Sequence, residues 1–133
     1  MNVLHGKIKQ IQTVNELSKI IIDLNGHTFT SLIIDIETFG DIAIGKEIKL
    51  LFKEAEVMIG TKESIVSASN AFVSTVKKIN QGEILSEVVF DFEGNDIISL
   101  ITTSSLQRLQ IEVDKEFLWF VKANEVTLQK EIK

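Results

Sequence analysis

The sequence has 133 residues, of which 44% are hydrophobic and 25% are charged, a balance typical of a globular protein. Its formal net charge of −5 disfavours a nucleic-acid partner, because phosphate binding requires clustered Lys and Arg. The absence of cysteine excludes disulfides and thiolate metal sites and fits a reducing compartment, so we expect a cytoplasmic protein. No apolar run is long enough to span a membrane and the first residues lack a secretory signal pattern, so we expect no membrane partner.

The chain is an internal repeat. A shift of 68 residues aligns the first half with the second, and after one added residue the alignment continues at a shift of 69. The matched pairs include Asn2 with Asn70, Asp23 with Asp91, Gly26 with Gly94, Ser31 with Ser99, Lys46 with Lys115 and Lys53 with Lys122. A match of this length with a single gap indicates a duplication. We therefore expect two modules, residues 1–63 and 64–133.

The first copy has the pattern of five short strands. Partly alternating and β-branched runs predict a strand over residues 4–11 and another over 20–24. The turn signal Asn25-Gly26, followed by a further apolar run, predicts a hairpin that contains the third strand. Later apolar runs predict strands over residues 48–52 and 56–59.

The second copy repeats this order. Strands are predicted over residues 72–79, 88–92, 117–121 and 125–128, with a hairpin turn at Glu93-Gly94. Ser104-Ser105, ahead of a Leu-x-x-Leu run, predicts an N-capped helical turn between the third and fourth strands. This order indicates an all-β protein of two tandem five-stranded OB-like barrels, each with a short helix. Because modules this small bury little surface, we expect the two to share a core or to oligomerise.

Catalytic motifs are missing from the sequence. His5 lies in a predicted strand and His27 beside a turn, and no motif surrounds either residue, so both are expected to be ordinary surface or half-buried side chains. No pattern of a metal site, of a catalytic nucleophile or of a glycine-rich phosphate loop is present. We expect neither an enzyme nor a metal centre.

The run from Phe117 to Val121 includes Trp119 and Phe120, which could stack on nucleic-acid bases. The run is apolar on both faces and has no cluster of basic neighbours. The pattern therefore favours a core strand or a subunit interface.

Three polar clusters in the second copy could hold an oxyanion. They are Ser67-Ala68-Ser69-Asn70 before its first strand, Thr102-Thr103-Ser104-Ser105 at the start of the helix, and Lys122-Ala123-Asn124 after the fourth strand. Hydroxyls and free N–H groups can donate to an anion, and a lysine can neutralise part of its charge. Ser and Thr also commonly serve as caps and turns, and that alternative remains open here.

These clusters carry a family resemblance. Ser67-Ala68-Ser69-Asn70 resembles the Ser-Ala-Arg-Asn opening of the molybdate-binding Mop (TOBE) modules, and Phe120-Val121-Lys122-Ala123 resembles their Ile-Lys-Ala segment. Ser99-Leu100-Ile101-Thr102 is similar to their third strand. The resemblance covers essentially the whole chain and is looser in the first copy. It is that of a tandem Mop/TOBE molybdate-binding protein, a molbindin.

The resemblance implies binding of molybdate or tungstate at interfaces between modules, with no organic cofactor. Carried over by position, the oxyanion-binding residues would be Ser67, Ala68 and Ser69 from one module and Thr102, Ser105, Lys122 and Ala123 from another. Lys53 would serve a possible second site. The family also implies a homo-oligomer, a trimer or a dimer.

Departures from the family pattern distinguish the two copies. Ser69 replaces the family's Arg, which removes a charge and a bidentate donor. In the first copy Ile34 and Glu37 stand where the second has Thr102 and Ser105. A carboxylate there would repel an oxyanion, so we expect the first copy's equivalent site to be weak or absent.

The leading hypothesis is therefore an intracellular protein that binds molybdate or tungstate for storage, buffering or homeostasis. The alternative is a ligand-sensing regulatory or protein-interaction module of the same fold, such as the effector part of a molybdate regulator or transporter. Residue types do not separate molybdate from tungstate, because the two anions are nearly equal in size.

Overall fold

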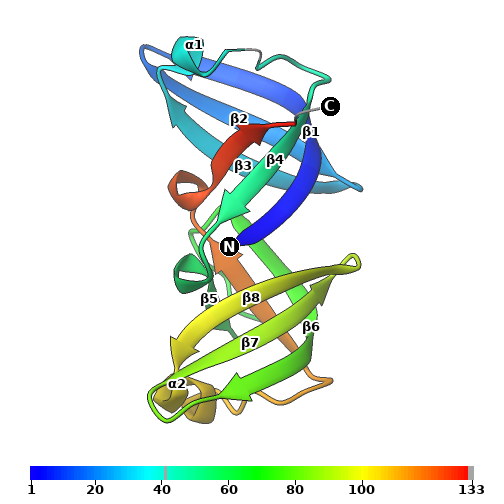
Figure 1. The fold of residues 1–133 in the computed structure, drawn as a ribbon, viewed down its shortest axis with the longest axis vertical. Helices are drawn as coiled ribbons and strands as arrows, with labels where there is room; N and C mark the ends of the chain where they lie inside the picture. The colour runs from blue at the N-terminus through cyan, green and yellow to red at the C-terminus, as the bar shows by residue number, and fades with distance from the viewer. Residues whose placement is uncertain (41, 132–133) are drawn as a thin grey trace.

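The computed structural model describes residues 1–40 and 42–131, which form two β-barrels stacked end to end (Figure 1). The first copy of the repeat supplies β1 (Asn2–Val14), β2 (Leu17–Leu24), β3 (His27–Ile34), α1 (Ile36–Phe39), β4 (Glu47–Phe52), the 3-10 turn η1 (Glu54–Glu56) and β5 (Met58–Gly60). The second supplies β6 (Asn70–Gln81), β7 (Leu85–Phe92), β8 (Asn95–Thr102), α2 (Thr103–Arg108), β9 (Glu116–Val121), the 3-10 turn η2 (Ala123–Glu125) and β10 (Thr127–Lys130). The predicted all-β, OB-like architecture with five strands and a short helix in each copy is confirmed.

The two sheets exchange their last strands. The strand order is β10-β4-β1-β2-β3 in one sheet and β5-β9-β6-β7-β8 in the other. Thus β10 pairs with β4 of the first copy, with Thr127 opposite Leu51, and β5 pairs with β9 of the second, with Met58 opposite Phe120. The modules expected at residues 1–63 and 64–133 are copies in sequence, and each sheet contains strands from both.

Both predicted hairpin turns have the backbone of a tight hairpin. Asn25 and Gly26 have φ values of 51° and 89°, and Glu93 and Gly94 have values of 51° and 81°. Two consecutive positive φ angles define the turn type that matches the twist of a tight hairpin. Glycine adopts such angles without cost, and asparagine adopts them more readily than most residues.

An asparagine from each copy covers the open edge of the other copy's sheet. The buried amide of Asn70 accepts from the Thr30 N–H at 2.8 Å and donates to the Thr30 carbonyl at 2.9 Å. Asn2 makes the same two bonds with Ile98, at 2.8 and 2.9 Å. Because β3 and β8 are the last strands of their sheets, each amide takes the place of a partner strand.

A second pair of hydrogen bonds crosses the junction at equivalent positions. The buried Ser31 hydroxyl donates to the carbonyl of Val126, and the buried Ser99 hydroxyl donates to that of Val57, both at 2.6 Å. These bonds attach β3 to the end of η2 and β8 to the end of η1. The repeat in the sequence therefore appears in the structure as reciprocal contacts between the barrels.

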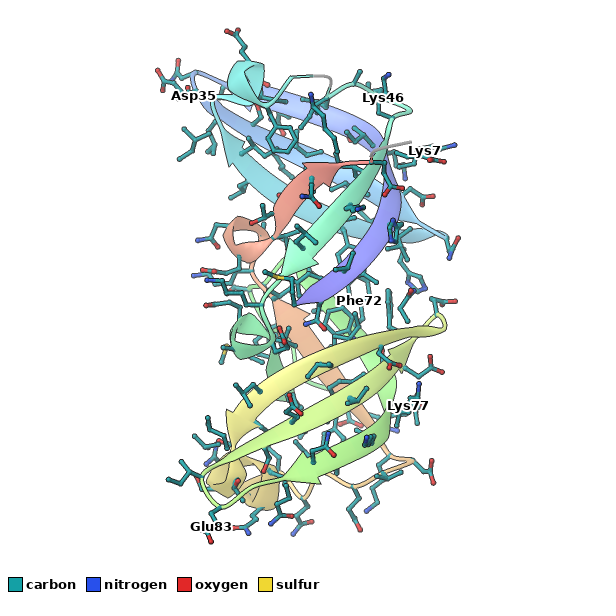
Figure 2. All side chains as sticks on the ribbon, viewed as in Figure 1. Lys7, Asp35, Lys46, Phe72, Lys77 and Glu83 are labelled. Atoms are coloured by element: carbon teal, nitrogen blue, oxygen red, sulfur yellow. The ribbon has the colours of Figure 1, made fainter. Side chains whose placement is uncertain are left out.

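The hydrophobic core is continuous across the junction and contains buried residues of both copies, as expected for modules this small. Phe29 stacks on Phe72 with ring centroids 4.6 Å apart, and Phe52 stacks on Trp119 at 6.1 Å. Phe72 lies between the two barrels in Figure 2. Trp119 is 0% exposed and donates its indole N–H to Ser74 Oγ, so its strand is a core strand and not a docking surface.

Replacing Asn70 with alanine should destabilise the whole chain. The substitution leaves the buried N–H and carbonyl of Thr30 without partners, and we expect the free energy of unfolding to fall by about 2–4 kcal/mol. Urea denaturation followed by Trp119 fluorescence would measure the loss. Asn80→Ala is the matched control on the same strand, because Asn80 is exposed and makes one bond of 3.4 Å, to Glu87. A loss as small as the control's, within about 0.5 kcal/mol, would contradict the role assigned to Asn70.

Candidate oxyanion-binding site

Five of the seven residues expected to bind the anion come together at one end of the β6–β9 pair. Asn70 is paired with Val121, so the segment Ser67–Ser69 that precedes β6 lies beside Lys122 and Ala123, which follow β9. Within the described part of the chain, no hydrogen bond or ion pair engages the side chains of Ser67, Ser69 or Lys122, and all three are exposed. We call these five residues the lysine half-site. It offers two hydroxyls and one ammonium group to a ligand.

Thr102 and Ser105 lie at the opposite end of the second barrel. Thr102 pairs with Leu85 at the start of β7, next to the far end of β6. The twelve residues of β6 therefore separate these hydroxyls from the lysine half-site, on the order of 35 Å of strand. Figure 1 shows this separation, with α2 at the outer end of the barrel and η2, which follows Lys122, near the junction. Lys122 and Ala123 are thus grouped with Ser67–Ser69, whereas the family pattern grouped them with Thr102 and Ser105.

The hydroxyls around α2 form a bonded cluster. Thr102 caps the helix, because its Oγ1 accepts from the Ser105 N–H at 3.2 Å. The capped turn predicted from Ser104-Ser105 is present, with its cap two residues earlier than that pair. Thr102 Oγ1 also lies 3.2 Å from Ser104 Oγ and donates to Ser105 Oγ at 2.9 Å. Thr103 is buried and anchors the helix, since its hydroxyl donates to the Gly82 carbonyl at 2.7 Å.

Arg108 belongs to this cluster, and the sequence analysis did not single it out as a binding residue. Its Nη2 donates to Ser105 Oγ at 3.2 Å from the last turn of α2. We call Thr102, Ser104, Ser105 and Arg108 the arginine half-site. The signal in the sequence was the spacing of three between Ser105 and Arg108, which places two side chains on one face of a helix.

The first copy lacks the equivalent hydroxyls. Ile34 occupies the position of Thr102 and is 72% exposed. The helix that follows, α1, begins after Asp35 in a left-handed conformation, has no side-chain cap hydrogen bond and contains only four residues. Glu37 adds a carboxylate in its first turn, as the alignment of the copies anticipated. This end of the first barrel therefore presents an apolar and acidic surface.

Lys53 is exposed at the position equivalent to Lys122, but its surroundings are acidic. It lines a shallow cavity of about 240 Å³ together with Glu56 and Glu125. The next residue is Glu54, in the position of Ala123, and its Oε2 lies 2.5 Å from the Met1 ammonium nitrogen. Carboxylates around a single lysine oppose the binding of an oxyanion.

Each of the two histidines lies within hydrogen-bond distance of a glutamate. His5 Nδ1 lies 3.0 Å from Glu131 Oε1, and His27 Nε2 lies 2.7 Å from Glu93 Oε1. His27 also packs on Phe72 and Phe92 at the junction, with ring centroids 5.7 and 5.0 Å away.

Among residues 1–40 and 42–131, no group of histidines and carboxylates has the arrangement of a metal site. No helix in these same residues is both long and apolar enough to cross a membrane.

The Met1–Glu54 contact predicts that the free energy of unfolding depends on pH. Hydrogen bonding to the Met1 ammonium group lowers the pKa of the Glu54 carboxyl below its ordinary value of 4.5. A carboxyl whose pKa is lower in the folded protein than in the unfolded chain stabilises the fold at pH values above the pKa of the unfolded chain. This stabilisation disappears as the pH falls through the pKa of the folded protein. Glu54→Gln should therefore lower the free energy of unfolding at about pH 6, by about 1 kcal/mol or less for so accessible a pair, and much less at about pH 3. Urea titrations at the two pH values test this, and acetylation of the Met1 amine should have the same effect. An equal loss at both pH values would contradict it.

Comparisons with known proteins concern the second copy and the overall fold. The family model described as the TOBE domain matches residues 66–128. Among solved structures, the chain is similar to the cytoplasmic molybdate-binding protein ModG in a form with molybdate bound, with a TM-score of 0.91 and 24% sequence identity, over 98% of this chain and 96% of ModG. No curated protein sequence matches the chain. The TOBE domain model thus matches the second copy of the repeat, and the whole chain has the fold of ModG.

Proposed function

We propose that this chain binds molybdate or tungstate inside the cell and serves to store or buffer the oxyanion. The observation that carries the proposal is the lysine half-site, where exposed hydroxyls and an ammonium group without partners adjoin one another at the end of the β6–β9 pair. Such groups donate hydrogen bonds to an anion, and no motif of a catalytic nucleophile or base surrounds them in the sequence. The function is therefore binding and not catalysis, and it needs no organic cofactor.

The chemistry of the ligand matches these donors. A tetrahedral dianion presents four acceptor oxygens, which hydroxyl and backbone N–H donors can satisfy without a large buried excess of positive charge. The Ser67 and Ser69 hydroxyls and the N–H groups of Ala68 and Ala123 supply such donors. Lys122 adds a charge-assisted hydrogen bond, worth about 1.5–3 kcal/mol.

The complete site is formed by two protomers. The lysine half-site and the arginine half-site of one chain lie at opposite ends of β6, so a single anion of a few ångströms cannot contact both. An anion that bridges the lysine half-site of one protomer and Thr102 and Ser105 of another uses every expected residue. The protein therefore acts as a homo-oligomer in which the oxyanion lies between chains.

The first copy acts mainly as scaffold. Residues 1–63 and 64–133 are the two copies of one module, but Ile34, Glu37 and Glu54 replace the donors of the second. Lys53 remains as the cation of a second, weaker site. The resemblance of the whole chain to ModG, a cytoplasmic protein whose structure holds molybdate, supports both the ligand and a cytoplasmic location.

Lys122→Ala should remove most of the binding of molybdate. In the wild-type chain, saturation with molybdate or tungstate at about 100 times the dissociation constant should raise the free energy of unfolding by about 2.7 kcal/mol. Loss of the charge-assisted bond should raise the dissociation constant about tenfold or more, as measured by calorimetry. Lys53→Ala is the matched control and should have a smaller effect. Equal losses would contradict the ranking of the two copies, and no stabilisation of the wild type by either anion would exclude the proposed ligands.

Complementation between two defective chains tests the two-protomer site. Lys122→Ala lacks the cation of one half-site, and Thr102→Val combined with Ser105→Ala lacks the hydroxyls of the other. If the halves belong to different protomers, oligomers that contain both variants have some sites with both halves intact. Co-expressed variants should therefore bind molybdate more tightly in calorimetry than either variant alone. Binding no tighter than that of the separate variants would contradict a shared site.

A further inference from the structure

The proposed site has a charge imbalance. Molybdate and tungstate carry two negative charges, whereas Lys122 is the only cation among the residues assigned to the site. The chain itself has a formal net charge of −5, so distant charges do not compensate. An anion enclosed between two protomers would retain about one uncompensated charge, which is unfavourable away from water. A second cation is therefore expected near the site.

We propose that Arg108 is this second cation and that it selects dianions over monoanions at the proposed site. The inference rests on the proposed function, because it takes Thr102 and Ser105 as the hydroxyls that face the anion. Arg108 is the only arginine in the sequence, and its guanidinium group donates to Ser105 Oγ at 3.2 Å. An anion held by Ser105 therefore lies within reach of the guanidinium group.

The hydrogen bonds within the cluster leave donors for a ligand. Ser105 Oγ accepts from both Thr102 Oγ1 and Arg108 Nη2, so its own O–H is directed away from these two partners. Arg108 makes no ion pair within residues 1–40 and 42–131, and its other N–H groups have no acceptor there. A guanidinium group presents a planar fork of N–H donors that matches two oxygens of an oxyanion. One serine hydroxyl and one arginine fork can thus face the same anion from one protomer.

A role for Arg108 in stability alone accounts for its position less well than a role in anion binding. The side chain is exposed, and its one bond is to a neutral hydroxyl. A basic residue in the last turn of a helix also interacts with the helix dipole, but this effect is small and concerns stability alone. It does not depend on which anion is in solution. Anion selectivity therefore separates the two roles.

The test compares molybdate with perrhenate, a tetrahedral anion of similar shape that carries one negative charge. Dissociation constants of both are measured by calorimetry, with perrhenate in competition with molybdate, for the wild type, Arg108→Ala and Arg108→Lys. Lys115→Ala is the matched control, because Lys115 is an exposed cation near α2 whose ion pair is with Glu112, and its loss changes the net charge equally. Urea denaturation without ligand checks that the variants fold.

Arg108→Ala should weaken molybdate binding about tenfold or more and perrhenate binding much less, so that the preference for the dianion falls. Arg108→Lys should retain most of this preference, because it keeps the charge, with some loss of affinity from the missing fork. The control should stay within about twofold of the wild type for both anions.

Results that contradict the role of Arg108 can be distinguished from results that contradict the proposed function. Equal losses for the two anions, or no loss in Arg108→Ala while Lys122→Ala still weakens molybdate, would overturn the role of Arg108 and leave the proposed function standing. A wild-type chain that binds neither molybdate nor tungstate would overturn both.

Discussion

The open edges of two strands, β3 and β8, are the constraint on which the rest of the structure depends. A last strand leaves backbone N–H and carbonyl groups without partners, and leaving these groups unsatisfied in a buried position is costly. Here the amide of Asn70 satisfies Thr30 and the amide of Asn2 satisfies Ile98. Because each barrel covers the other's edge and lends it a fifth strand, the two copies form one structural unit with one core.

This exchange also determines where the polar groups lie. The chain leaves β9 at Lys122 and crosses the junction through η2, so the lysine half-site lies near the middle of the molecule. β8 runs outward from its turn with β7 to α2, so the arginine half-site lies at the outer end, where Figure 2 also shows Glu83. The distance between them follows from the length of β6. In the proposed function, a ligand that needs both sets of donors contacts two chains, which would link binding to association.

The two copies present different polar groups because a few side chains differ on the same scaffold. Thr102 supplies a hydroxyl that caps α2, whereas Ile34 supplies none and α1 is shorter. Ala123 adds no charge beside Lys122, whereas Glu54 brings a carboxylate that bonds to the Met1 ammonium group. The polar residues that join the copies are the same in both, Asn2 and Asn70 in one pair and Ser31 and Ser99 in the other. Duplication has thus kept these reciprocal hydrogen bonds, whereas the aromatic contacts and the outer surfaces differ between the copies.

The sequence by itself determined the duplication, the strands, the two hairpin turns and the capped helix α2, because these depend on local patterns such as Asn25-Gly26 and the Thr102 cap. It also identified the polar residues of the second copy by type. Only the tertiary structure decided which sheet receives β5 and β10, since strand pairing depends on contacts distant in the sequence. It likewise buried Trp119 between the barrels, separated Lys122 from Thr102, and placed Arg108 against Ser105. Proximity of that kind arises from the path of the chain through space, and residue types alone do not encode it.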